Sequence, residues 1–224
     1  MSKIIDLTMT IKEGMQTFAA HWHPFVEITQ LGRHGIENRE TRKLTLGTHT
    51  GTHIDAPRHF IPEGETVEQI DMDRLIGKAA VLDFSELDDF VEISKEMLKE
   101  KVNNRTIEKL IFRFDWHKRL GTNAYYSDHP YLSEDACQWL VMQGCKLIAL
   151  DTPQPDNPKN HRMAPKDAPN HKILLGAGVI IVEYLIDLDK IVQPEVSLYV
   201  APLKIENGDG APARCFVIED IDCG

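Results

Sequence analysis

The chain has 224 residues with 25 basic and 35 acidic side chains, so its formal net charge is −10. Hydrophobic residues make up 42% and charged residues 27%, a composition typical of a folded protein and not of a disordered one. The negative balance argues against nucleic acid as a partner, because phosphate binding requires clustered lysine and arginine. No apolar run reaches the roughly 18 residues of a membrane span. The N-terminus lacks the apolar segment of a signal peptide. The four cysteines form no C-x-x-C pair. Because no signal peptide or membrane span is indicated, we expect a cytoplasmic protein with no membrane partner. We also expect one domain over residues 1–224.

Short apolar segments bounded by turn or charged residues predict a series of strands. They cover residues 4–8, 40–47, 78–84, 110–114, 146–150, 179–183, 196–201 and 214–218. Two helices are predicted, over residues 94–101 and 133–143, with Ser94 and Ser133 as N-caps and Gly144 just past the second helix. Residues 151–169 contain five prolines and predict a long loop. Together these elements favour an α/β fold with a mixed sheet.

The segment over residues 49–59 concentrates the chemistry-bearing side chains: three histidines and one aspartate within eleven positions. A helix is disfavoured there because Gly51 and several β-branched residues interrupt it. In an extended chain, side chains alternate between faces, so His49, His53 and Asp55 share one face with the gap left by Gly51. That face presents two imidazoles and one carboxylate.

Pro57 is expected to turn the chain next, which could bring His59 back over the same pocket. Imidazole and carboxylate together suit zinc, manganese or ferrous iron. The alternative is a set of ordinary polar residues beside a sheet, but burying such a cluster without a metal would be costly. Thr50 stands where a zincin of H-E-x-x-H type has its general base, so that class is excluded. No serine lies in a G-x-S-x-G elbow, which excludes that class of hydrolase.

Residues 49–59 match the pattern H-x-G-T-H-x-D-x-P-x-H and thereby resemble the metal-dependent cyclase and kynurenine formamidase family, which includes isatin hydrolases. A second match is the pair His171 and Glu183, twelve residues apart. Weaker framing matches at residues 4–7 and 215–218 extend the resemblance over nearly the whole chain. The resemblance implies a swivelling β/β/α domain with a mixed β-sheet core and peripheral helices.

The resemblance also implies two divalent metal ions per chain, zinc foremost and manganese as the alternative. By this resemblance, the ligands of one ion would be His49, His53 and Asp55. The ligands of the other ion would be Asp55, His171 and Glu183, so the two ions would share Asp55.

Further expectations follow from the same resemblance. His59 would be the catalytic acid/base, and Trp22 would lie in the region that lines the substrate pocket, where an aromatic ring could stack on an aryl substrate. Family members are usually homodimers or higher oligomers with pockets near the subunit interface. Asp151 and Asp156 lie in the proline-rich loop, either near the metals or as turn caps, and both interpretations stay open.

The function implied is hydrolysis of a small aryl formamide or related amide by a metal-bound hydroxide. The substrate favoured is N-formylkynurenine, which would give kynurenine and formate in tryptophan catabolism. The alternatives are an isatin hydrolase, another lactam or lactone hydrolase of the family, and a non-catalytic member that binds a small ligand.

Overall fold

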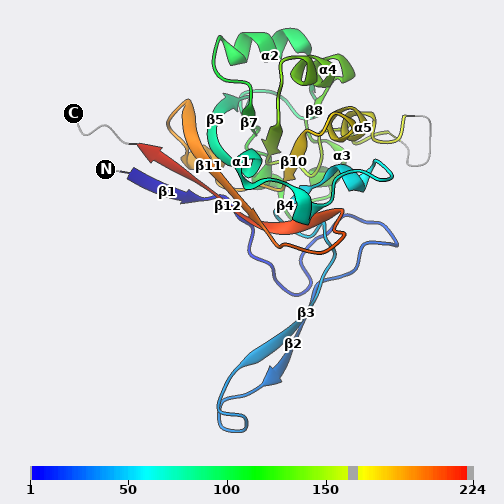
Figure 1. Ribbon diagram of the computed structural model, residues 1–224, viewed down its shortest axis with the longest axis vertical. Helices are drawn as coiled ribbons and strands as arrows, with labels where there is room; N and C mark the ends of the chain where they lie inside the picture. The colour runs from blue at the N-terminus through cyan, green and yellow to red at the C-terminus, as the bar shows by residue number, and fades with distance from the viewer. Residues whose placement is uncertain (1, 161–165, 221–224) are drawn as a thin grey trace.

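The computed structural model describes residues 2–160 and 166–220. Its main feature is an eight-stranded mixed sheet, most of whose strands are labelled in Figure 1. The strand order is β1-β12-β11-β5-β7-β9-β10-β4. The strands are β1 (Ser2–Asp6), β4 (His53–Asp55), β5 (Ile76–Asp83), β7 (Lys109–Arg113), β9 (Leu147–Leu150), β10 (Ile180–Glu183), β11 (Glu195–Pro202) and β12 (Gly210–Asp220).

A further pairing joins β4 to β12, so seven of these strands form a closed ring of pairings. Strands β5, β7, β9 and β10 run parallel to one another, and the remaining pairs are antiparallel. Residues 210–212 of β12 pair with β4, and residues 213–218 pair with β11. The long last strand therefore brings the C-terminal region beside the motif of residues 49–59.

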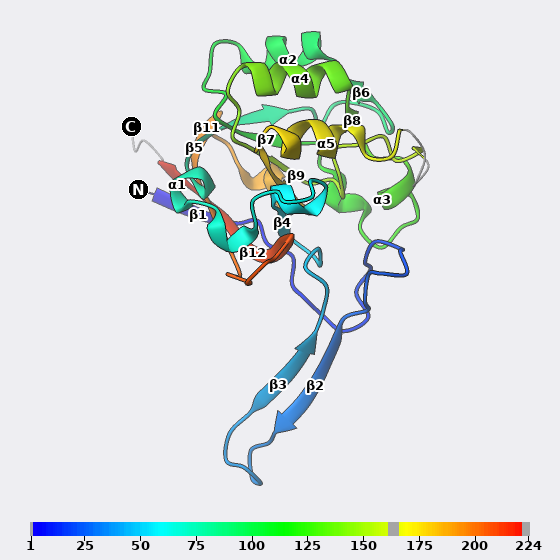
Figure 2. The ribbon, with the colours of Figure 1, turned by 45° about the vertical axis from the view of Figure 1, so that its right-hand side comes forward.

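Two apolar clusters follow from the alternation of side chains along the parallel strands. On β9, Leu147 and Ala149 belong to one cluster, whereas Ile148 and Leu150 belong to the other. The second cluster also contains buried residues of the helices α2 (Lys95–Val102), α4 (Glu134–Met142) and α5 (Pro169–Gly176). These helices lie together on one side of the sheet in both ribbon views (Figures 1 and 2). Strands buried on both faces explain the continuous apolar runs in the sequence.

The two predicted helices are confirmed with their caps. The hydroxyl of Ser94 accepts a hydrogen bond from the backbone N–H of Met97, and that of Ser133 accepts one from Ala136. Each such cap stabilises a helix by about 1 kcal/mol. Gly144 has a φ of 80°, the left-handed conformation expected just past a helix. The predicted α/β class, with a sheet-dominated core and few helices, is confirmed as well.

Several elements differ from the prediction. The strand expected over residues 40–47 is the second strand of a hairpin made of β2 (Glu27–Gly32) and β3 (Thr41–Thr45), and β2 was not predicted. Helix α5 begins at Pro169, within the segment expected to be a loop. Other short elements are α1 (Met72–Leu75), α3 (Ala124–Ser127), β6 (Glu92–Ile93) and β8 (Tyr131–Leu132), together with the 3-10 helices Pro57–His59, Val67–Gln69, Trp116–Arg119 and Leu188–Lys190. Within the described ranges, none of the helices is long and apolar enough to cross a membrane.

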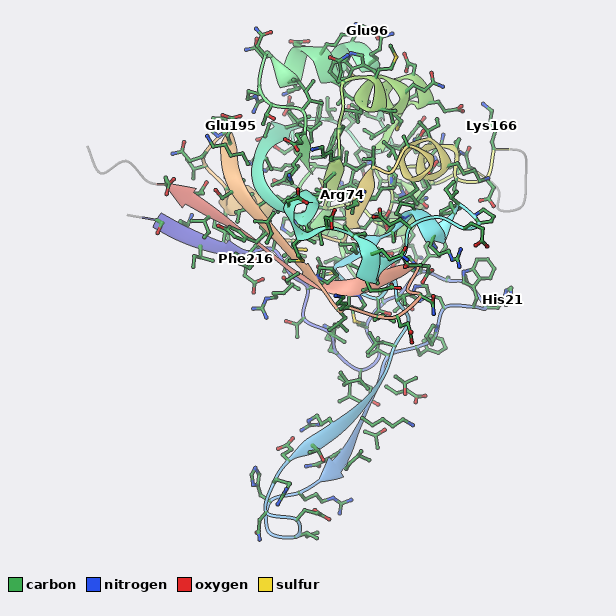
Figure 3. All side chains as sticks on the ribbon, viewed as in Figure 1. His21, Arg74, Glu96, Lys166, Glu195 and Phe216 are labelled. Carbon is green, nitrogen blue, oxygen red and sulfur yellow. The ribbon has the colours of Figure 1, made fainter. Side chains whose placement is uncertain are left out.

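The β2–β3 hairpin projects from the body of the molecule (Figure 2). The side chains along it stand clear of the rest of the chain (Figure 3). Large apolar side chains are exposed along it and at its base: Phe25, Leu31, Ile36 and Leu44. A two-stranded hairpin is marginally stable on its own in water. Contact of these exposed apolar side chains with another surface would therefore stabilise the hairpin.

Candidate metal centre

Strands β4 and β10 place three acidic or imidazole side chains together. The two strands are antiparallel neighbours, and His53 is directly opposite Glu183. Residues two apart on a strand share a face, so Asp55 lies on the same side as His53. The Nε2 atom of His53 is 3.3 Å from Oδ1 of Asp55 and 3.4 Å from Oε2 of Glu183. All three side chains are buried.

His49 joins this group from a turn and not from a strand, so the expectation of an extended chain over residues 49–52 is wrong. Strand β4 covers only residues 53–55. Gly51 has a φ of 62°, and this left-handed conformation turns the chain before the strand begins. The His49 side chain nevertheless meets Asp55, with 2.7 Å between Nδ1 and Oδ1.

Pro57 turns the chain as expected, because it begins a short 3-10 helix, Pro57–His59. Its fixed φ suits the first position of a helix. The turn places the His59 ring against the His49 ring, with 3.9 Å between their centroids. His59 is thus close to the cluster and also lines the adjoining cavity.

His171 reaches the same place from helix α5, more than a hundred residues along the chain. Its Nε2 atom is 3.3 Å from Oδ2 of Asp55 and 3.3 Å from Oε1 of Glu183. The two oxygens of Asp55 therefore face different histidines, since Oδ1 faces His49 and His53 while Oδ2 faces His171. Asp55 thus lies between His171 on one side and His49 and His53 on the other, and Glu183 also faces His53 through Oε2 and His171 through Oε1.

Each of these three histidines makes a second hydrogen bond on the side facing away from Asp55. Nδ1 of His53 donates to the backbone oxygen of Gly51 at 2.8 Å. Nδ1 of His171 donates to the carboxylate of Asp156. Nε2 of His49 lies 2.8 Å from the carboxylate of Asp209. Such outward partners hold a hydrogen on the outward nitrogen, so the inward nitrogen is the one that can coordinate a metal, as in metal sites.

Two buried oxygens face Nε2 of His171 at 3.3 Å without a hydrogen bond, and this arrangement suits a cation. Oδ2 of Asp55 and Oε1 of Glu183 are buried and have no hydrogen-bond partner among the described residues. Unpaired buried polar atoms are costly, whereas a divalent ion would satisfy both oxygens. The set of imidazole and carboxylate donors suits zinc or manganese.

The electrostatics of the side chains alone agree with this fit. Burial, together with the charge of Asp55, raises the pKa of Glu183 above its usual value. Burial opposes a charge on His49, but Asp55 and Asp209 outweigh it and raise the pKa of His49 to about 10. In the absence of a cation, the positive charge of protonated histidine thus balances the negative charge of the carboxylates. A metal ion would displace those protons on binding.

The cluster lies in the wall of a cavity of about 830 Å³. Aromatic side chains contribute to the lining: Phe18, Trp22, Phe60, Tyr126 and Tyr184. Trp22 is 60% exposed and packs edge-on against His21. A cavity of this size and character is suited to a small aromatic molecule.

The two aspartates of the proline-rich loop have different positions. Asp151 is fully buried and accepts hydrogen bonds from the backbone N–H groups of Phe114 and Trp116, so it holds the segment after β7 and does not cap a turn of its own loop. Asp156 instead contacts His171 and so lies beside the candidate metal ligands. Asp209 was not selected from the sequence, because only the β4–β12 pairing brings it near His49.

Comparison with known proteins identifies relatives of this chain. Residues 5–157 match the family model named Cyclase. A kynurenine formamidase from Bacillus cereus is 33% identical over 216 residues, which cover 96% of this chain and 97% of that protein. The structure of isatin hydrolase A from Labrenzia aggregata, bound to benzyl benzoate, has a TM-score of 0.88 and 25% identity and covers 97% of this chain and 93% of that one.

A further solved structure is that of a "predicted metal-dependent hydrolase" from Bacillus stearothermophilus, with a TM-score of 0.77, 25% identity, and coverage of 98% of this chain and all of that one. The cluster of candidate metal ligands and these similarities indicate the same class of protein. The chain belongs to the Cyclase family, with the kynurenine formamidases among its relatives, and it is a metal-dependent amidohydrolase of that family.

Proposed function

We propose that the chain binds two divalent ions, zinc foremost and manganese as the alternative. Asp55 would be shared between them. The first ion would take His49 and His53 with Asp55, and the second would take His171 and Glu183 with Asp55. The opposed directions of the two Asp55 oxygens support this division.

The substrate we propose is an aryl formamide, with N-formylkynurenine as the foremost candidate, hydrolysed to kynurenine and formate. The observation that carries this proposal is the position of the five proposed ligands in the wall of one aromatic-lined cavity. Kynurenine formamidases at about 30% identity over 96% of the chain support the choice of substrate. Trp22 is proposed to contact the aryl ring.

Bound divalent ions would supply an activated water, because metal binding lowers the pKa of water from 15.7 to roughly 7. The protein's own acid/base is proposed to be His59. Burial lowers the pKa of His59, so the ring is neutral and able to accept a proton at neutral pH. It would then deliver that proton to the departing aniline nitrogen.

A combined metal and turnover measurement tests the proposal. Metal-replete protein should carry two ions per chain and hydrolyse N-formylkynurenine, and a chelator should abolish turnover. Isatin and simple lactones belong in the same assay, because the isatin hydrolase similarity makes that activity the second candidate. Less than one ion per chain would refute the metal centre. Bound metal without turnover of any compound would favour the non-catalytic, ligand-binding alternative.

We also propose that the chain forms a homodimer in which the β2–β3 hairpin contacts the second copy. The exposed apolar side chains of the hairpin support this: Leu31 is 58% exposed and Leu44 56%. The double variant Leu31→Asp, Leu44→Asp should halve the mass measured by light scattering after gel filtration. An unchanged mass would exclude the hairpin as the contact. The cytoplasmic location expected from the sequence stays a prediction.

A further inference from the structure

The carboxylate of Asp209 lies between a proposed metal ligand and the proposed acid/base. Its Oδ2 atom is 2.8 Å from Nε2 of His49 and 3.1 Å from Nδ1 of His59. An ionised carboxylate can only accept hydrogen bonds. Both facing ring nitrogens must therefore carry a hydrogen.

This constraint selects the tautomer of each ring. When a metal ion displaces the second proton of His49, the hydrogen kept on Nε2 leaves the lone pair on Nδ1, the atom that faces Asp55 at 2.7 Å. A hydrogen on Nδ1 of His59 leaves the lone pair on its Nε2. One oxygen thus makes His49 able to bind a metal and His59 able to accept a proton, each through a defined atom.

The backbone around Asp209 is closely packed, so the fold fixes where its side chain begins, and the contacts with His49 and His59 hold the carboxylate. The carbonyl oxygen of Asp209 accepts a hydrogen bond from Ala56 at 2.9 Å. Gly210 pairs with Asp55 across the sheet. A Cβ atom at Gly210 would come within 2.7 Å of Cε1 of His49 and 2.5 Å of the backbone oxygen of Ile54. The glycine thus leaves the space that the His49 ring occupies.

We propose that Asp209 is a positioning residue that orients His49 and His59 together and so links occupancy of the first metal site to proton transfer. The part that concerns His59 rests on the proposed function. The part that concerns His49 rests on the proposed metal site and not on the proposed substrate. Asp156 provides a comparison, because it contacts His171 and belongs to the second site.

The test compares Asp209→Asn with Asp209→Glu. An amide can turn its NH₂ group towards a ring nitrogen and so favour the wrong tautomer, whereas glutamate keeps an ionised acceptor. In Asp209→Asn we expect the affinity of one zinc site to fall by roughly 10- to 100-fold, the range for loss of an outward partner, with the other site unchanged. In Asp156→Asn the other site should weaken instead. The control Glu206→Gln removes one charge from an exposed position on the same loop and should leave both sites as in the unmodified protein.

Two further measurements separate positioning from general damage. Nitrogen-15 NMR of the zinc-loaded protein should show the Nδ1–H tautomer of His59, and Asp209→Asn should lose it while Asp209→Glu restores it at least in part. With N-formylkynurenine, kcat should fall by a larger factor than KM changes. Unchanged zinc affinity and an unchanged His59 tautomer in Asp209→Asn would overturn the inference. Because the zinc and NMR measurements need no substrate, they decide the role of Asp209 even if the unmodified protein hydrolyses none of the compounds.

Discussion

Replacement of His59 with alanine is expected to lower kcat for the formamide by about two to four powers of ten while both metal ions stay bound. This is the usual contribution of a positioned general acid/base. His59 lines the cavity and contacts the cluster through the His49 ring, 3.9 Å away between centroids, but it donates to Asp209 and not to Asp55. Its loss should therefore remove proton transfer without removing a proposed ligand.

Metal content, measured on the same protein as turnover, decides whether His59 is an acid/base or a metal ligand. The donor atoms of His49, Asp55 and His59 lie close enough together to hold one ion. A His59→Ala protein that lost one ion would therefore make His59 a ligand and contradict its role as acid/base. His34, exposed on the hairpin between β2 and β3, supplies a control, and His34→Ala should retain normal kcat and metal content.

The local part of the site could be predicted from the sequence because its residues are near one another along the chain. The segment of residues 49–59 contains its own turn-forming Pro57, and its alternation correctly groups His53 with Asp55. The position of His49 was predicted for the wrong reason. A strand was expected, whereas the left-handed Gly51 turns the chain and still brings the ring to Asp55.

The distant part of the site depends on strand register, which a single sequence does not specify. Glu183 meets His53 only through the pairing of β10 with β4, and it was selected by family resemblance. Asp209 depends on the pairing of β12 with β4, and no spacing in the sequence points to it. Helix α5 was not predicted because it begins at Pro169 after the left-handed Ala168, with no side-chain cap to mark its start.

The variant Asp55→Asn is expected to lose both metal ions and all measurable turnover. Asp55 is 1% exposed, and its two oxygens face the two proposed sites, so one substitution removes a ligand from each. The amide has nearly the same shape, but it lacks the charge and offers a single oxygen. By contrast, His171→Asn should lose only the second ion, and His53→Asn only the first.

Thermal unfolding measures zinc binding by the Asp55→Asn protein without depending on activity. A ligand that binds only the folded state stabilises it by about 2.7 kcal/mol when its free concentration is 100 times its Kd. Zinc added to the metal-free, unmodified protein should therefore raise Tm, whereas Asp55→Asn should show no such rise. The two single-site variants should show intermediate rises. If Asp55→Asn kept one ion and part of the rise, the sites would not share this carboxylate, and the arrangement would consist of two independent centres.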